Sequence, residues 1–315
     1  MTSLRLIADD LTGALDTAAE FVGVTGPVST FWHGAIPSAL PANAALDSGT
    51  RELDTGAATQ TVAALTPVLE GAGIAFKKVD SLMRGATLAE VAVCMRVGGW
   101  RHAIMAPAFP YQGRITRDGV QYARNMQGGW PAVGGDIASQ LQSLDVAARH
   151  THHDDPLSRG INVFNAETDT ELDRIVANYS THEDVLWIGT GGLAQALTRP
   201  APASAGADLP APLLGLFGSD QPVTTAQLAA CGADWFALSD GDVADASVVG
   251  NRLRASGRLV ASLKLPAGLA RDDAARRIGT SLHRLVRDPS TAGHAYRCRR
   301  RDAARPLPLA QGAQP

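Results

Sequence analysis

The sequence predicts an α/β protein whose N-terminal domain is built on a parallel β-sheet. Short apolar segments that fit buried strands alternate with longer segments of helical periodicity, beginning with the strand Leu4–Ala8 and a helix after Gly13. Such alternation is typical of parallel sheets whose strands are joined by helices. Polar residues follow several of these strands, and in open sheets of this kind ligands bind beyond the carboxyl ends of the strands.

The composition fits a cytoplasmic enzyme with one large or two ordinary domains. The 315 residues are 45% hydrophobic and 19% charged, and a formal net charge of −3 gives no reason to expect a nucleic-acid or membrane partner. The three cysteines are far apart, match no metal-binding spacing and suit a reducing compartment. We expect no signal peptide, and no apolar run approaches the roughly 20 residues of a membrane helix.

The first domain is expected to cover residues 1–200. Residues 107–119 interrupt the alternation with two prolines and two glycines, which predict a loop. Residues 150–155 contain three histidines but match no zinc pattern, so we expect a solvated polar loop. The other expected strands are 27–32, 44–51, 73–81, 102–106 and 161–166, and the other expected helices are 55–71, 88–97, 135–144 and 168–179. Residues 184–194 are expected to form a strand, a glycine-rich turn and the start of a helix.

A linker and a smaller, incomplete α/β domain are expected next. Residues 201–212 are rich in proline and alanine, as linkers are, and residues 213–290 again combine strands and helices. Thr224 or Thr225 is expected to cap the first helix of this domain. Residues 291–315, which are basic and then rich in alanine and proline, are expected to be disordered or foreign to the fold. The expected strands here are 213–220, 235–238 and 259–263, with a helix at 270–286.

The segment Ile7–Asp16, IADDLTGALD, carries the clearest functional signal. Asp9 and Asp10 follow the first strand, and Thr12 stands at the start of the first helix. Two carboxylates at this position can accept hydrogen bonds from sugar hydroxyls, hold Mg²⁺ or take a proton. One of these side chains could simply cap the helix, but a cap needs one residue and three crowd this turn.

Together, the motifs of this chain resemble those of the four-carbon acid sugar kinase family, also described as DUF1537. The resemblance implies ATP- and Mg²⁺-dependent phosphorylation of the terminal hydroxyl of a sugar acid such as threonate, erythronate or an oxo derivative. It implies an N-terminal sugar-acid-binding domain and a C-terminal nucleotide-binding domain, and a homodimer is an assembly we consider. The matching segments are IADDLTGALD (7–16), KKVDSLMRG (77–85), PAFPYQGRITRDG (107–119), WIGTGGLA (187–194) and GSDQPVTTAQ (218–227).

The resemblance extends to individual residues of a sugar-acid site. Asp10 and Asp9 are the candidates for the general base and for orienting hydroxyls, and we favour Asp10 as the base. The Arg84 guanidinium suits the carboxylate of a sugar acid. Lys77 and Lys78 point to opposite faces of their strand, so only one of them, taken here as Lys78, should face the crevice. The substrate-binding candidates are Lys78, Asp80, Ser81, Arg84, Gly85, Arg114 and Thr116.

On the nucleotide side, Gly218 and Ser219 match the GS motif of the family, whereas Asp220 and Gln221 depart from it. The turn at Gly191 offers backbone N–H groups that suit an anion, although tight helix packing explains a glycine there equally well. These three residues, Gly191, Gly218 and Ser219, are the candidates for binding ATP. No set of metal-ligating residues is predicted.

The C-terminal segment departs from the family. Members carry a GGxT loop that cradles the ATP phosphates, and no GGxT follows residue 285. The resemblance therefore implies a nucleotide domain that is truncated at its C-terminus. The alternative to a kinase is a catalytically impaired sugar-acid-binding remnant, and we expect this chain to bind its sugar acid better than it binds ATP.

Overall fold

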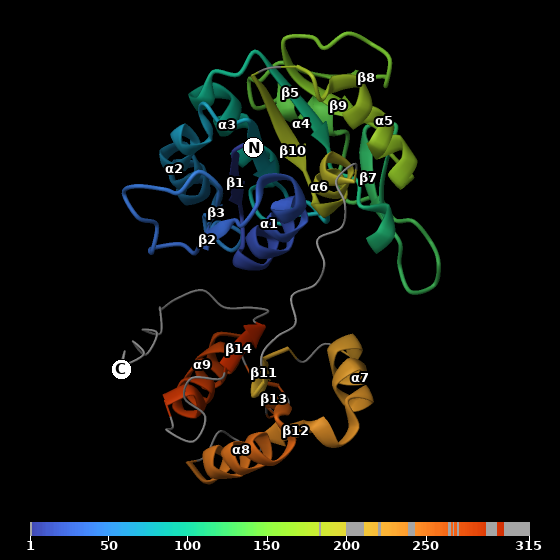
Figure 1. The fold of residues 1–315 in the computed structure, drawn as a ribbon. Helices are drawn as coiled ribbons and strands as arrows, with labels where there is room; N and C mark the ends of the chain where they lie inside the picture. Colours follow the sequence, from blue (N-terminus) through green and yellow to red (C-terminus); the bar gives the residue numbers. More distant parts are fainter. Residues whose placement is uncertain are drawn as a thin grey trace. The chain divides into compact units, whose positions relative to one another are not determined.

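The chain divides into two compact units, Met1–Ala205 and Gly206–Pro315 (Figure 1). The computed structural model describes residues 2–182, 184–199, 211–219, 222–238, 243–263, 266, 268–269, 271–287 and 295–298. Most of the expected linker, residues 201–210, lies outside the described residues. Each unit has its own parallel sheet, so the predicted α/β fold is confirmed.

An eight-stranded sheet forms the centre of the first unit, in the order β2-β3-β1-β4-β10-β5-β9-β8. Helices α1, α5 and α6 pack on one face, and α2, α3 and α4 pack on the other. The strands are β1 (Leu4–Ala8), β2 (Ser29–Phe31), β3 (Ala44–Asp47), β4 (Ile74–Lys78), β5 (His102–Ala106), β8 (Ala148–Thr151), β9 (Gly160–Phe164) and β10 (Val185–Gly189). The helices are α1 (Leu11–Thr25), α2 (Thr55–Leu65), α3 (Thr87–Gly98), α4 (Ile137–Gln142), α5 (Asp169–Tyr179) and α6 (Gly191–Thr198).

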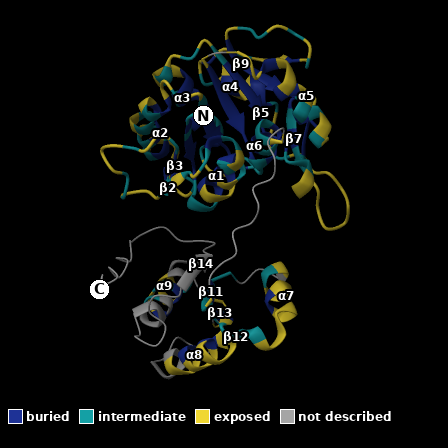
Figure 2. Cartoon of the chain, in the orientation of Figure 1, coloured by how far each residue is buried: buried dark blue, intermediate teal, exposed yellow. Residues whose placement is uncertain are grey.

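Alternate side chains of the strands fill two separate cores. In β1, Leu4, Leu6 and Ala8 belong to the core beneath α1, α5 and α6, whereas Ile7 belongs to the opposite core. The central strands are accordingly buried on both faces (Figure 2). This is the pattern of parallel strands covered by helices. It leaves the ends of the strands, rather than their faces, within reach of a ligand.

The order of the strands reverses direction at β1. Helix α1 connects β1 to β2, at one edge of the sheet. Helix α2 connects β3 to β4 and so runs in the opposite direction across the sheet, past β1. Because the two connections run in opposite directions, α1 and α2 lie on opposite faces of the sheet. Reversals of this kind are the places where open α/β sheets bind ligands.

The segment expected to be a loop at 107–119 is largely regular. After a 3₁₀ turn at Pro110–Gln112, strands β6 (Arg114–Arg117) and β7 (Val120–Ala123) form an antiparallel hairpin. Asp118 and Gly119 both have positive φ, 47° and 72°, as the central residues of a type I′ turn require. Asp-Gly between two segments that contain β-branched residues predicts such a turn, and the prolines nearby obscured that signal.

Other boundaries also differ from the sequence prediction. The expected polar loop at 150–155 begins inside the edge strand β8, which pairs with β9. The helix expected to reach residue 71 changes to a 3₁₀ turn at Thr66, because Pro67 has no N–H to continue an α-helix.

The second unit contains a four-stranded parallel sheet in the order β12-β13-β11-β14. Its first helix begins at Pro222 rather than after Thr224 or Thr225, and proline is favoured at the first helical position. Within residues 291–315, which were expected to be disordered or foreign to the fold, Ala295–Cys298 form β14 beside β11. The elements are β11 (Leu213–Phe217), α7 (Pro222–Ala230), β12 (Trp235–Leu238), α8 (Val243–Ser256), β13 (Arg258–Leu263), α9 (Arg271–Arg287) and β14 (Ala295–Cys298).

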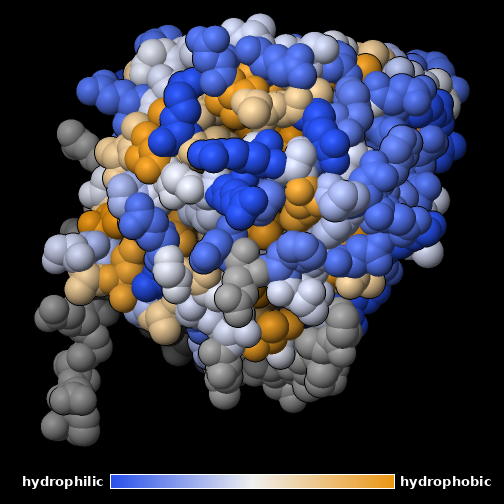
Figure 3. Space-filling model, turned by 90° about the horizontal axis from the view of Figure 1, so that it is seen from above, coloured by the Kyte–Doolittle hydropathy of each residue, from blue (hydrophilic) through white to orange (hydrophobic). Residues whose placement is uncertain are grey.

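The surface carries no sign of a membrane segment in the part of the chain that the structure describes. No helix there combines the length and the apolarity that crossing a bilayer requires. On the face shown in Figure 3, hydrophobic residues appear in several small groups among hydrophilic ones. Small exposed apolar groups of this kind are normal for globular proteins.

Replacing Phe76 should destabilise the first unit strongly. Its side chain is fully buried in β4, and its ring meets that of Phe21 edge-on at 5.7 Å between centroids. We expect Phe76→Ala to lower the free energy of unfolding by about 3–5 kcal/mol. Hydrogen exchange of the β4 peptide in urea would measure this loss in the first unit. Tyr111→Ala, at a side chain that is 82% exposed, should change it by less than about 0.5 kcal/mol, and equal losses would contradict the prediction.

Candidate functional site

The candidate site lies where β1, β3 and β4 end side by side. Asp9 and Asp10 directly follow β1, Arg51 lies in the loop after β3, and Asp80 follows β4. The β3 loop is tied to β1 by its backbone, since the N–H groups of Ser48 and Arg51 donate to the carbonyls of Ala8 and Asp9. Charged residues that are far apart in sequence therefore meet at the carboxyl end of β1.

Arg51 is the centre of this arrangement. Its Nε and Nη2 donate to the two oxygens of Asp9 at 2.6 and 2.8 Å, and its Nη1 donates to Asp10 Oδ2 at 2.5 Å. Its Nη2 also lies 3.4 Å from Asp80 Oδ1. Burial opposes the charge, but the hydrogen bonds to Asp9 and the charges of the three carboxylates raise the pKa of Arg51 above its ordinary value. One guanidinium thus joins three carboxylates.

Sequence reasoning did not identify Arg51 as a site residue. It stands in the polar turn after the third strand, and the available signal was a polar segment at the end of a buried strand. Nothing in the sequence alone says that this strand lies directly beside β1 in the sheet.

Asp9 and Asp10 differ in accessibility. Asp9 is 3% exposed, and both of its oxygens are held by Arg51. The Asp10 side chain is 29% exposed, and its Oδ1 accepts the Gly13 N–H at 2.8 Å as the N-cap of α1. Capping and participation in the charged cluster are therefore combined in Asp10. Of the two, Asp10 is the carboxylate that a solute can reach.

Asp80 organises the turn that follows β4. Its carboxylate accepts hydrogen bonds from Arg84 Nε and Nη2, both at 2.8 Å, and from the backbone N–H groups of Leu82 and Arg84. Burial favours the neutral acid, but the hydrogen bonds from Arg84 and the charge of Arg51 outweigh it and hold the pKa of Asp80 at about 2. Arg84, which was expected to bind a substrate carboxylate, is paired with Asp80 while its side chain stays 50% exposed.

Lys77 and Lys78 lie on opposite sides of β4. Lys77 is fully buried and pairs with Glu90 of α3 at 2.8 Å. Lys78 approaches the turn at the start of α1, where a Cβ added to Gly13 would lie 3.1 Å from its Nζ. Burial lowers the pKa of Lys78, and Asp9 and the other carboxylates oppose that effect. Lys78 therefore belongs to the cluster around Arg51, and Lys77 belongs to the packing beneath it.

Gly85 permits two loops to touch. Its φ is +70°, and an added Cβ would lie 2.7 Å from the carbonyl oxygen of Arg51. A side chain there would push the β3 loop away from the β4 turn. The glycine therefore acts through backbone approach.

Three other predicted substrate-binding residues, Ser81, Arg114 and Thr116, lie in or beside the β6–β7 hairpin. Thr116 is fully buried and donates to Gln121 Oε1 at 2.7 Å, so its hydroxyl holds the hairpin instead of facing an open crevice. The carbonyl of Ser81 accepts from Gln121 Nε2 at 3.1 Å. Arg114 starts β6, and its Nη1 donates to the carbonyl of Gln112.

The glycines expected to bind ATP lie in close packing contacts. A Cβ on Gly191 would lie 2.9 Å from the Phe109 ring, so the glycine lets α6 pack closely on the segment after β5. In the second unit, a Cβ on Gly218 would lie 2.9 Å from Ile278 of α9. Ser219 accepts a hydrogen bond from Thr224 at 3.3 Å, and Asp220 and Gln221 lie outside the described residues.

The described residues include no group of three or more His, Cys, Asp or Glu side chains that could hold a metal ion. The carboxylates of Asp9, Asp10 and Asp80 instead face Arg51 or Arg84. The cluster therefore does not fit Mg²⁺, the ion expected from the resemblance.

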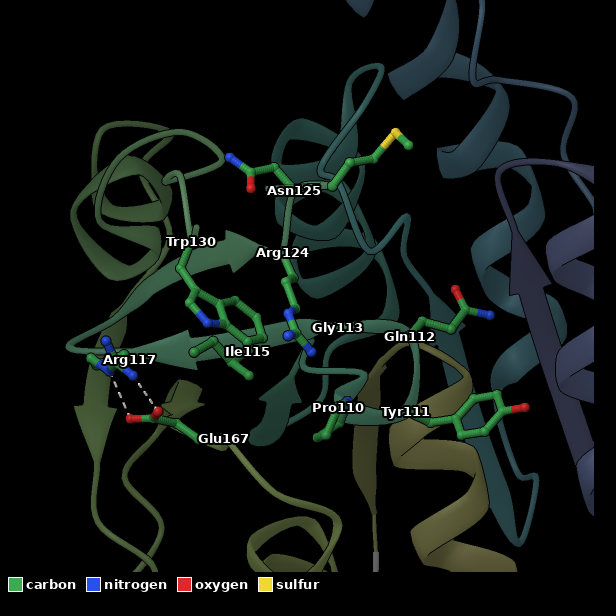
Figure 4. A pocket seen from close by; sticks show the side chains of 11 residues that line it. Pro110, Tyr111, Gln112, Gly113, Ile115, Arg117, Arg124, Asn125, Trp130 and Glu167 are labelled. Carbon is green, nitrogen blue, oxygen red and sulfur yellow. Dashed lines mark hydrogen bonds and ion pairs between the residues drawn. The ribbon is translucent and has the colours of Figure 1, made fainter. Parts of the chain in front are cut away.

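A separate hollow of about 590 Å³ opens beside the hairpin (Figure 4). The side chains of Arg124 and Trp130, both from the segment that follows β7, line it, and the ion pair of Arg117 with Glu167 lies at one end (Figure 4). None of the residues of the Arg51 cluster lines this hollow. The cluster is the stronger candidate for the site, because oppositely charged groups converge there.

The fold defines a two-unit α/β protein whose first unit carries a charged cluster at the end of β1. Residues 4–152 match the family model of the sugar-binding N-terminal domain, which spans the whole Arg51 cluster. Among solved structures, a Haemophilus influenzae protein of the DUF1537 family is similar with a TM-score of 0.60 and 16% identity, over 90% of this chain and 82% of that one. That similarity supports the fold.

Two curated relatives are D-threonate kinases. The protein of Bordetella bronchiseptica is 29% identical over 331 aligned positions, covering 92% of this chain and 81% of the relative. The protein of Cupriavidus necator is 29% identical over 273 positions, covering 73% of this chain and 63% of the relative. The family model and these relatives support the resemblance to the four-carbon acid sugar kinases, an enzyme family, that the motifs indicated.

The pairing of Asp80 should make stability depend on pH in the acid range. Because its pKa falls from 3.8 to about 2 on folding, ionised Asp80 stabilises the fold above pH 4, and the stabilisation is lost as pH falls toward 2. We expect Asp80→Asn, which mimics the protonated acid, to cost about 2 kcal/mol at pH 6 and much less at pH 2.5. Urea unfolding at both pH values measures the difference. A cost that does not change with pH would contradict the assignment.

Proposed function

We propose that the protein transfers a phosphoryl group from ATP to the terminal hydroxyl of a four-carbon sugar acid of the threonate, erythronate or 3-oxo-tetronate type. The observation that carries the proposal is the cluster in which Arg51 joins Asp9, Asp10 and Asp80 at the end of β1. It lies within the part of the chain that matches a sugar-binding domain. The D-threonate kinase relatives supply the reaction class.

The charges of the cluster suit a small polyhydroxy acid. The half-exposed guanidinium of Arg84 and the ammonium of Lys78 are cations that can attract the substrate carboxylate. Asp10 presents a partly exposed carboxylate that can accept a hydrogen bond from a substrate hydroxyl. A ligand that carries both groups can engage cations and anions of the same cluster.

Asp10 is the proposed general base. Asp9 is enclosed by Arg51, whereas Asp10 is accessible and held in place from two sides, by the Gly13 N–H and by Arg51 Nη1. When a substrate hydroxyl attacks, Asp10 can accept its proton, because it is already oriented by these contacts. ATP would supply the phosphoryl group.

The nucleotide side stays a prediction. In the described part of the second unit, Gly218 lies against Ile278 and Ser219 accepts a hydrogen bond from Thr224, and these contacts do not by themselves form a phosphate cradle. Magnesium is expected to arrive with the phosphates of the nucleotide, because Mg²⁺ is commonly bound through substrate phosphates. A cytoplasmic location and a homodimer likewise stay predictions from the sequence.

Kinetics of an Asp10→Asn variant would test this proposal. Asparagine caps helices about as well as aspartate, so the substitution removes the base while keeping the cap of α1. With Mg-ATP and the preferred member of a panel of threonate, erythronate and their oxo derivatives, we expect kcat to fall about 100-fold or more. Asp154→Asn, at an exposed residue paired with Arg174, should leave kcat and KM unchanged.

The same panel separates the two functions considered for this chain. Turnover by the wild-type protein, measured as ADP release, supports the kinase. A rise in Tm with a sugar acid, without ADP release and without a response to Mg-ATP, would support the sugar-acid-binding remnant instead. Full activity of Asp10→Asn would exclude Asp10 as the base.

A further inference from the structure

Gln121 of β7 joins three segments through one buried amide. Its side chain is fully buried. Its Nε2 donates to the carbonyl of Ser81 and to that of Pro107, both at 3.1 Å, and its Oε1 accepts from Thr116 at 2.7 Å. The two carbonyls can only accept and the Thr116 hydroxyl donates to the oxygen, so the partners fix the orientation of the amide.

The segment that Gln121 reaches is the turn of the candidate site. Ser81 directly follows Asp80, which binds Arg84 and lies beside Arg51. The same turn contains Met83 at φ 52°, an unfavourable conformation for a residue with a side chain, and Gly85 at φ 70°. A turn with such a backbone requires support from outside itself.

The hairpin can give that support because it is anchored elsewhere. Thr116 exchanges backbone hydrogen bonds with Ala166, which follows β9, at 2.9 and 3.0 Å. Pro107 follows β5. Gln121 therefore links the Asp80 turn to the segments that follow β5 and β9, which lie beyond β10 in the same sheet. Neither of these segments contributes a charge to the Arg51 cluster.

We propose that Gln121 is a positioning residue that holds the Asp80–Arg84 turn in the geometry that binds the sugar-acid substrate. The proposal deepens the proposed function and rests on it for the identity of the substrate. Gln121 does not touch the substrate. It acts by fixing the carbonyl of Ser81, and through that carbonyl the place of Asp80 and of the Arg84 guanidinium.

A matched control is available in Asn162 of β9. Its amide is also fully buried, and its Nδ2 donates to the carbonyls of Ala103, Ser158 and Gly160. In the sheet, β10 and β5 separate β9 from β4. Asn162→Leu therefore removes a similar buried network away from the Asp80 turn.

Kinetics would separate positioning from general stability. We expect both Gln121→Leu and Asn162→Leu to lower Tm. Only Gln121→Leu should raise KM for the sugar acid, by about 10-fold or more, and it should change kcat by less than about threefold. Gln121→Glu keeps the acceptor for Thr116 but places a second oxygen opposite two carbonyls. It should therefore raise KM in the same way, and it serves if the leucine variant does not fold. An unchanged KM in both Gln121 variants, or an equal rise in Asn162→Leu, would overturn the proposal.

A second measurement does not depend on the substrate. If Gln121 acts on the Asp80 turn, the Tm losses of Gln121→Leu and Asp80→Asn should not add in the double variant. Gln121→Glu replaces Gln121→Leu in this test if the leucine variant does not fold. The Tm losses of Asn162→Leu and Asp80→Asn should add. Additive losses for Gln121 and Asp80 would overturn the proposal even if the protein binds another ligand. A wild-type protein that ignores every sugar acid, combined with non-additive losses, would instead contradict the proposed function alone.

Discussion

The candidate site depends on the contact of one guanidinium with three carboxylates. Asp9, Asp10 and Asp80 come from two adjacent strand ends, and without a cation between them their charges would repel and lose hydration together. Arg51 offsets both effects, and its own backbone N–H binds the Asp9 carbonyl. The contact that balances the charge therefore also fixes the path of the β3 loop. Charge balance and loop conformation cannot be altered independently in this part of the molecule.

The sequence was sufficient for the regular parts of the fold. Strands such as β1 and β4 are buried on both faces and read as short apolar runs, and their helices have strong periodicity. Prediction failed where local signals overlapped. In the hairpin, the Asp118–Gly119 turn is surrounded by prolines and glycines that indicate a loop. The edge strand β8 and the strand Ala295–Cys298 are polar or basic, and they become strands through their neighbours in the sheet.

The site was predictable to the extent that it follows from strand ends. Asp9, Asp10 and Asp80 stand directly after apolar strands, so their position at one edge could be expected. Arg51 could not, because its role depends on the order of strands in space. The pairing of Arg84 with Asp80 and the burial of Thr116 also arise from tertiary contacts. Motifs identify which residues are near a site, whereas the direction of each side chain requires the structure.

The close approach of Gly85 to Arg51 has a consequence for sequence divergence. A Cβ added at residue 85 would lie only 2.7 Å from the Arg51 carbonyl oxygen. The backbone of one loop therefore cannot change unless the backbone of the other changes with it. A related chain with a larger residue at this position must therefore also have a β3 loop of different length or path. The residue at position 85 and the β3 loop are therefore expected to covary between relatives, although they are more than 30 residues apart in the sequence.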